Sequence, residues 1–243
     1  MAKDTIKLQN KGNTLMVAHR GLFVVDMGNS IPAFTDAAAR THYGIECDIH
    51  VTKDKKIVVN HDDDLGTTCD RSMVIEKSLF EDVRAARIKS IYGNEYENDE
   101  MRIPTMEEYI NICKAGDKYC IIELKNRFAT EDIKSVIAEI EKLEYLHKVI
   151  FISFSLENCI DIRTLLPEQP IQYLVGEYNK QVLEALDKYS LDLDIHYHHL
   201  SASVIKEVHA HGRKVNAWTV DAPLHAQYFI DWGIDFITTN YLE

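Results

Sequence analysis

Residues 45–49 read Ile-Glu-Cys-Asp-Ile, and this short stretch decides the fold. Side chains of a strand alternate between its two faces, so Glu46 and Asp48 point the same way as His50 while their apolar neighbours point the opposite way. The apolar side chains are expected to pack against helices. The carboxylates must then face the interior of a barrel near its top, where the functional groups of such folds gather.

Strand-like and helix-like segments alternate along the whole chain. Eight apolar runs predict strands at residues 15–19, 45–51, 119–124, 149–153, 171–175, 191–196, 214–220 and 235–239. Seven amphipathic stretches predict helices at residues 30–43, 105–115, 130–143, 156–166, 181–188, 202–211 and 222–232. Strict alternation favours a parallel sheet, and eight strands favour its closure into an α/β barrel of the TIM (β/α)8 type. No helix is expected after the last strand.

One interval interrupts this rhythm. Roughly forty residues separate His61 from Pro104, where a connection of a few residues is usual. We predict one domain over residues 1–243, with a small subdomain inserted at residues 62–102, after the second strand and on top of the barrel.

Composition and charge narrow the class of partner. The chain has 243 residues, and 27 basic against 39 acidic side chains give a net charge of −12. A surface this acidic repels phosphate backbones, so nucleic-acid binding is not expected. A small anionic substrate is compatible with it if local cations and a metal ion offset the field. The sequence does not indicate an oligomeric state.

Features of targeting segments are missing from the sequence. Residues 1–13 are polar, which predicts no signal peptide, and no apolar run approaches the length of a membrane span. The five cysteines are scattered and none forms a C-x-x-C pair. Reduced thiols and a cytoplasmic location are therefore expected.

A metal site is predicted from three carboxylates. Glu123 shares a strand face with Lys125, and its strand follows that of Glu46 and Asp48 in the predicted barrel. Carboxylate oxygens are hard ligands that suit Mg²⁺ or Ca²⁺ better than Zn²⁺. The alternative is a buried network without metal, in which Lys125 pairs with Glu123.

Two histidines and an arginine are expected beside these carboxylates. His19 and Arg20 follow the first strand, and His61 follows a turn and a short strand that return toward the top. The fork of an arginine suits phosphate, and histidine transfers protons near neutral pH. With a metal ion and a second cation, this set indicates phosphoryl transfer by acid–base catalysis.

Weaker candidates lie after later strands. Trp218 ends the seventh strand and is interpreted as a wall of the substrate pocket or as a core residue. A group of histidines follows the sixth strand, where it either binds a ligand or is merely solvated: His196, His198 and His199.

The order and spacing of these motifs resemble the glycerophosphodiester phosphodiesterase family. The matching segments are residues 18–21 (AHRG), 29–34 (NSIPAF), 44–48 (GIECD), 52–54 (TKD), 58–62 (VVNHD), 103–108 (IPTMEE), 122–125 (IELK), 153–154 (SF), 218–220 (WTV) and 233–238 (GIDFIT). The resemblance implies a barrel with an inserted subdomain that hydrolyses glycerophosphodiesters, such as glycerophosphocholine, to glycerol 3-phosphate and an alcohol.

The resemblance also implies roles for individual residues. Metal ligation is implied for Glu46, Asp48 and Glu123. Acid–base catalysis is implied for His19 and His61, and phosphate binding for Arg20 and Lys125. The chain departs from the family pattern at Gly28, where the family often has Glu, and at Asn240, where it often has Asp. Alternatives are a diesterase of the same fold for lysophospholipids or phosphoinositol, and a silent barrel that only binds.

Overall fold

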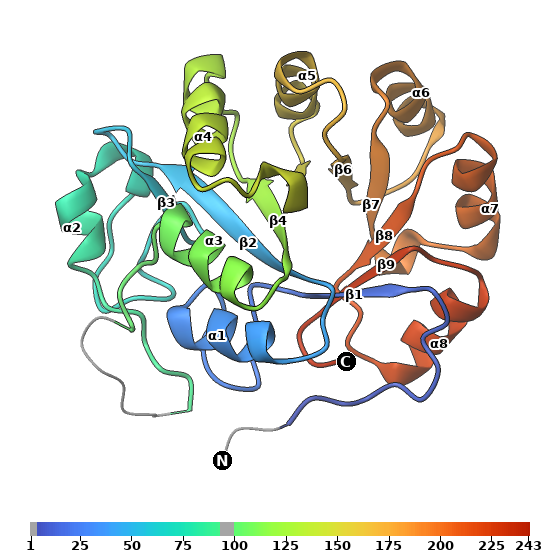
Figure 1. Ribbon diagram of the computed structural model, residues 1–243, viewed down its shortest axis with the longest axis horizontal. Coiled ribbons are helices and arrows are strands. Elements are labelled where there is room, and N and C mark those ends of the chain that lie inside the picture. The colour runs from blue at the N-terminus through green and yellow to red at the C-terminus, as the bar shows by residue number, and fades with distance from the viewer. Residues whose placement is uncertain (1–3, 93–99) are drawn as a thin grey trace.

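Eight parallel strands close into a barrel in the computed structural model, which describes residues 4–92 and 100–243 (Figure 1). The barrel strands are β1 (Leu15–Ala18), β2 (Gly44–Val51), β4 (Tyr119–Leu124), β5 (Val149–Ser153), β6 (Ile171–Val175), β7 (Asp192–His196), β8 (Val215–Trp218) and β9 (Phe236–Thr239). Each pairs in parallel with the next, and β1 pairs with both β9 and β2, which closes the ring. The predicted TIM-type barrel is confirmed.

Seven helices follow the strands on the outside of the barrel. They are α1 (Ile31–Ala39), α3 (Met106–Ala115), α4 (Thr130–Lys142), α5 (Leu156–Leu165), α6 (Lys180–Tyr189), α7 (Ala202–Ala210) and α8 (Pro223–Asp231). Their first turns are capped by the side chains that the sequence offers. Ser30 caps α1, and Thr105 forms a capping box with Glu108 at the start of α3.

Helix α1 is shorter than predicted. It was expected to continue to residue 43 but ends at Ala39, and Arg40 is already extended. The Arg40 side chain turns back to Asp36, with Nε 2.7 Å from its carboxylate, while Glu243 accepts a hydrogen bond from the backbone N–H of Thr41. The contact between Thr41 and Glu243 joins parts of the chain 202 residues apart, so it is not visible in a local pattern.

No helix follows β9 in the described part of the chain, as expected. Residues 241–243 instead pair with residues 6–8: Ile6 N–H donates to Tyr241 at 2.8 Å, and Glu243 N–H donates back to Ile6 at 2.9 Å. Among the described residues, no helix has the length and apolarity needed to cross a membrane.

Two apolar layers hold the barrel. The outer faces of the strands pack against the helices, while a smaller cluster fills the barrel beneath the carboxylates and, through Ile152 and Leu174, beside them in the pocket. The buried members of this inner cluster are Val17, Ile121, Ile150, Ile152, Leu174 and Phe236. The bottom of the barrel is therefore packed with side chains, and polar groups are confined to the remaining inward positions.

Strand β2 extends past its barrel neighbours and folds back as a hairpin. The antiparallel strand β3 (Ile57–Val59) returns along it until Asn60 N–H donates to the Asp48 carbonyl at 3.0 Å. Residues 61–92 and 100–105 then run to α3. They include η1 (Ile75–Lys77) and α2 (Phe80–Arg84), and they pack around a small apolar cluster of their own.

Candidate active site

The three predicted carboxylates meet at the top of the barrel. In the parallel register of β2 and β4, Asp48 lies directly beside Glu123, and Glu46 lies two residues earlier on β2. All three side chains are buried. One oxygen from each lies within 4.8 Å of the others, which is close enough for one cation to touch all three.

A sharp turn after β1 brings a backbone donor to this cluster. Arg20 and Gly21 both have left-handed backbones, with φ of 54° and 78°. A Cβ on Gly21 would lie 2.6 Å from a backbone carbon of Ala33, so only glycine fits here. The turn aims the N–H of Arg20 at Glu46, to which it donates at 2.8 Å.

Two cations face the same carboxylates. Lys125 Nζ lies 2.9 Å from Glu123 Oε1 and 3.2 Å from Asp48 Oδ1, and Arg20 Nε lies 3.2 Å from Asp48 Oδ2. Asn29 adds a hydrogen bond of 2.7 Å from its amide to Asp48. Asp48 is therefore the most strongly paired of the three acids.

This pairing separates the proton affinities of the acids. Burial and the Asp48 charge raise the pKa of Glu46 well above its usual value and that of Glu123 to about 7. Burial also opposes ionisation of Asp48, yet Lys125 and Arg20 hold its pKa far below the usual range. A cation bound between Glu46 and Glu123 would favour their ionised forms and so oppose this rise in pKa.

The donor set fits a hard divalent cation. Asp48 Oδ1 and Glu123 Oε1 are buried and, among the described residues, neither accepts a well-formed hydrogen bond although Lys125 is near. The ion pair between Lys125 and Glu123, expected for a network without metal, is therefore present. It still leaves carboxylate oxygens without a hydrogen bond. Carboxylates with free lone pairs are the ligands that Mg²⁺ and Ca²⁺ prefer.

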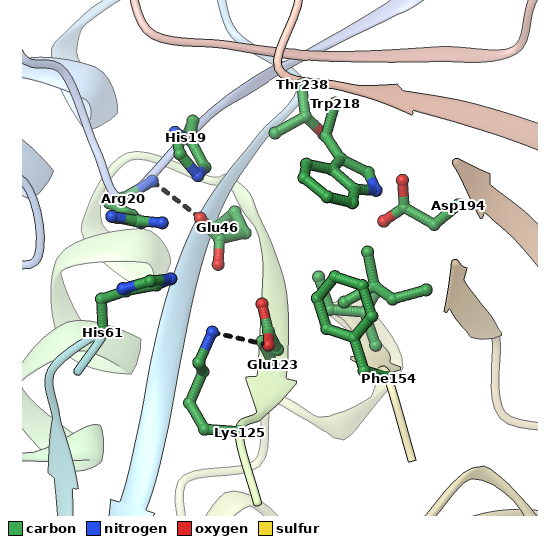
Figure 2. A pocket seen from close by; sticks show the side chains of 12 residues that line it. His19, Arg20, Glu46, His61, Glu123, Lys125, Phe154, Asp194, Trp218 and Thr238 are labelled. Atoms are coloured by element: carbon green, nitrogen blue, oxygen red, sulfur yellow. Dashed lines mark hydrogen bonds and ion pairs between the residues drawn. The ribbon is translucent and has the colours of Figure 1, made fainter. Parts of the chain in front are cut away.

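The two histidines lie on the same wall of the pocket as Arg20 (Figure 2). His19 Nδ1–H donates to Asn240 Oδ1 at 2.8 Å, because an amide oxygen can only accept. This leaves His19 Nε2 as the basic nitrogen. Burial and the Arg20 charge lower the pKa of His19 to about 4, so the ring is neutral at pH 7.

His61 is held differently. Its Nδ1–H donates to Asp62 at 2.6 Å, and burial lowers its pKa below the usual value although the Asp48 charge opposes this. The β2–β3 hairpin explains its position, since it returns the chain to the level of Asp48.

A pocket of about 380 Å³ opens between these groups and an aromatic wall. Phe154 and Trp218 form this wall, with their rings edge to face at 5.5 Å, opposite Arg20 and Lys125 (Figure 2). The site thus has one charged side and one apolar side, an arrangement suited to a small anion with an organic substituent.

A sequence model of the glycerophosphoryl diester phosphodiesterase family matches residues 19–243. The chain belongs to this family. It is therefore a phosphoric diester hydrolase.

Relatives of known sequence agree with this assignment. A glycerophosphodiester phosphodiesterase of Bacillus subtilis is 24% identical over 97% of this chain and 88% of its own length. Another, of Caldanaerobacter subterraneus subsp. tengcongensis, is 26% identical over 93% of this chain and 94% of its own. These values describe distant relatives that are matched along nearly their whole length.

Solved structures share the fold. A glycerophosphodiester phosphodiesterase from Parabacteroides distasonis has a TM-score of 0.81 and 27% identity, and the match covers 95% of this chain and 94% of the other. A phosphodiesterase from Oleispira antarctica, solved with the product sn-glycerol-3-phosphate, has a TM-score of 0.86 at 24% identity, over 93% of both chains.

The structure also places the weaker candidates in this diesterase. Trp218 lines the pocket. His196 packs its ring 4.9 Å from Trp218, and His198 and His199 belong to a short 3₁₀ helix at Tyr197–His199; none of the three histidines lines the pocket.

One departure from the family pattern has a local steric reason. A Cβ at Gly28 would lie 2.6 Å from the Phe23 ring and 2.9 Å from Arg20 Cβ. Phe23 in turn stacks on His19 at 6.4 Å between ring centroids. A glutamate at position 28 would therefore displace Phe23 and Arg20, which contact His19 and Asp48.

The pocket contains an acid that sequence reasoning missed. Asp194 on β7 lines the pocket. The alternation of polar side chains could have predicted it, because Asp192, Asp194 and His196 share one face of a strand just as Glu46 and Asp48 do. Asp221 was also missed: it accepts hydrogen bonds from the backbone N–H and the side-chain amide of Asn240, both at 2.7 Å.

A double substitution should change the proton affinity of His19. Asp221→Asn with Asn240→Asp can keep the hydrogen-bond chain but moves the carboxylate next to Nδ1–H, which favours the imidazolium. We expect the pKa of His19 to rise from about 4 by one unit or more, measured by NMR titration of the ring. If His19 acts as a base in catalysis, the acid limb of the rate profile should move to higher pH together with this pKa. Asp221→Asn alone is the control. An unchanged pKa of His19 in the double variant would contradict the inference that Asp221 acts on His19 through Asn240.

Proposed function

We propose that this diesterase hydrolyses glycerophosphodiesters, such as glycerophosphocholine, to glycerol 3-phosphate and an alcohol, with a divalent metal ion and two histidines. The observation that carries the proposal is the meeting of Glu46, Asp48 and Glu123 with His19 and His61 around one pocket. The names of its relatives and the glycerol-3-phosphate held by the Oleispira antarctica protein support it.

Glu46, Asp48 and Glu123 would hold the metal ion, Mg²⁺ or Ca²⁺. When bound, the ion would neutralise part of the charge of the diester and favour charge development at phosphorus. The open oxygens of Asp48 and Glu123 support this role, because each leaves room for a further ligand bond. The raised pKa of Glu46 and Glu123 supports it as well, since the nearby cations do not fully offset burial and the Asp48 charge.

Arg20 and Lys125 would bind the phosphate oxygens. Both already lie at the charged side of the pocket, and each is tied to Asp48 by an ion pair of 3.2 Å. Anchoring each cation to a buried carboxylate reduces the conformational entropy that it would lose on binding substrate. Arginine adds a planar fork that fits two phosphate oxygens.

His19 and His61 would share the proton transfers. The neutral ring of His19, with Nε2 free, suits a general base, and His61, hydrogen-bonded to Asp62, suits the acid that protonates the leaving alkoxide. Trp218 and Phe154 would exclude water from the organic part of the substrate.

The insertion and the location are further parts of the proposal. We infer one domain over residues 1–243 with residues 62–102 inserted beside the mouth; the Asn126 amide donates to Asp63 at 3.0 Å and to Glu76 at 2.8 Å, which ties the insertion to the loop after β4. Five unpaired, buried cysteines support a cytoplasmic location, where the enzyme would serve lipid and glycerol metabolism.

Chelation should abolish activity if the carboxylates hold a metal ion. We expect no release of glycerol 3-phosphate from glycerophosphocholine after EDTA treatment, and recovery with Mg²⁺ or Ca²⁺. Glu46→Gln keeps the shape but removes a ligand charge, so calorimetry should show affinity for the ion reduced about tenfold or more. Glu131→Gln, on the exposed side of α4, is the matched control. Full turnover after exhaustive chelation would exclude the metal.

Removal of either histidine should slow the reaction without unfolding the protein. His19→Ala and His61→Ala should each reduce kcat by a factor on the order of 10² to 10⁴, since each removes one proton-transfer group. His147→Ala in η2 (Leu146–Lys148) is the control, because that residue precedes β5 at the other end of the barrel. A variant with normal kcat would show that its histidine is structural.

The nucleophile can be identified with a modified substrate. The glycerol hydroxyl next to the phosphorylated carbon is tethered near phosphorus, so it can attack with a high effective concentration and form a cyclic phosphate. The alternative is attack by water. We expect a diester that lacks only this hydroxyl to bind with a similar KM but to turn over at least about 10²-fold more slowly. Comparable turnover would identify water as the nucleophile.

A further inference from the structure

Two polar groups in the wall of the pocket lack a partner. Asp194 on β7 is 1% exposed, and its Oδ1 has no hydrogen bond to any described residue. The indole Nε1 of Trp218 on β8 is likewise buried and unpaired within the described part of the chain. Figure 2 shows the Asp194 carboxyl pointing to the indole edge of Trp218, so an acceptor and a donor face the same corner of the pocket.

Three uncharged polar side chains inside the barrel are satisfied. Asn216 donates to Gln172 at 3.1 Å, and Thr238 Oγ1 donates to Asn216 at 3.2 Å. Asp194 Oδ1 and the indole N–H of Trp218 differ from these three and resemble the open carboxylate oxygens of Asp48 and Glu123. A buried polar group without a partner destabilises the protein, so a ligand that pairs with both groups would gain binding energy here.

A hydroxyl group matches this pair. It donates one hydrogen bond and accepts another, so it can serve Asp194 and the indole N–H together. An ammonium group only donates and would leave the indole unpaired. Burial and the Glu123 charge also raise the pKa of Asp194 well above its usual value, so this carboxyl is no fixed negative charge for a cationic head group.

We propose that Asp194 and Trp218 Nε1 bind the terminal hydroxyl of the glycerol moiety and thereby select glycerol over other diols. The inference rests on the proposed function. Asp194 and Trp218 lie across the pocket from His19 and His61, which must face the reacting oxygens (Figure 2). The hydroxyl that reaches this corner is therefore the one farthest from phosphorus, and both residues determine specificity rather than transfer protons.

The test compares two substrates with the same leaving alcohol. One is the glycerol diester, and the other is the propane-1,2-diol diester, which lacks only the terminal hydroxyl. We expect the wild type to prefer glycerol by about 10²-fold or more in kcat/KM, because a site built around a hydroxyl is left with unpaired groups by the analogue. Asp194→Leu and Trp218→Phe should each reduce this preference at least about tenfold. Trp218→Phe changes one N–H group and keeps the ring.

The control is Asp192→Leu, two residues earlier on the same strand, whose carboxylate accepts from Lys214 N–H at 2.8 Å outside the pocket. It should keep the preference. A second measurement needs no turnover: sn-glycerol 3-phosphate should bind more tightly than inorganic phosphate by calorimetry, and Trp218→Phe should narrow this difference.

Three results would count against the subsite or its basis. An unchanged preference in both Asp194→Leu and Trp218→Phe would overturn it. The proposal would also be overturned if these variants changed the preference among leaving alcohols but bound glycerol 3-phosphate as the wild type does. The head group of the leaving alcohol would then occupy this corner of the pocket. A wild type that hydrolyses neither diester would contradict the proposed function instead, and the calorimetric comparison would still decide whether the corner binds glycerol.

Discussion

The mutual repulsion of three buried carboxylates is the constraint on which the site depends. Glu46, Asp48 and Glu123 lie within reach of a single ion, in a region with little water to screen them. Lys125 and Arg20 reduce that repulsion with positive charge, and the left-handed turn after β1 reduces it with a backbone N–H. The site is therefore a cluster of acids and cations in which open carboxylate oxygens are left to accept a further cation.

The barrel makes this balance possible through register and packing. Parallel pairing of β2 with β4 fixes Asp48 beside Glu123 without any choice of rotamer. The apolar cluster fills inward positions beneath and beside the acids, and the long β2–β3 hairpin returns His61 to the level of Asp48. Strands thus position the three acids, while the connections after strands position His19, Arg20 and His61 beside the pocket.

Sequence reasoning recovers what depends on periodicity and misses what depends on distant contacts. The alternation in residues 45–49 gave the inward-facing carboxylates, because period 2 survives in any buried strand. The predicted end of α1 was wrong, since Thr41 is held by Glu243 from the far end of the chain. Asp221 could not be recognised because it contacts Asn240, nineteen positions away. Asp194 had the same alternating pattern as Glu46 and Asp48, and the prediction overlooked it.

Two side chains of the barrel's inner apolar cluster have a second role. Ile152 and Leu174 belong to this cluster and also line the pocket. A substitution that changes the volume of either one would therefore alter the packing of the interior and the shape of the pocket together. At these two positions, the stability of the barrel and the fit of a bound molecule depend on the same atoms.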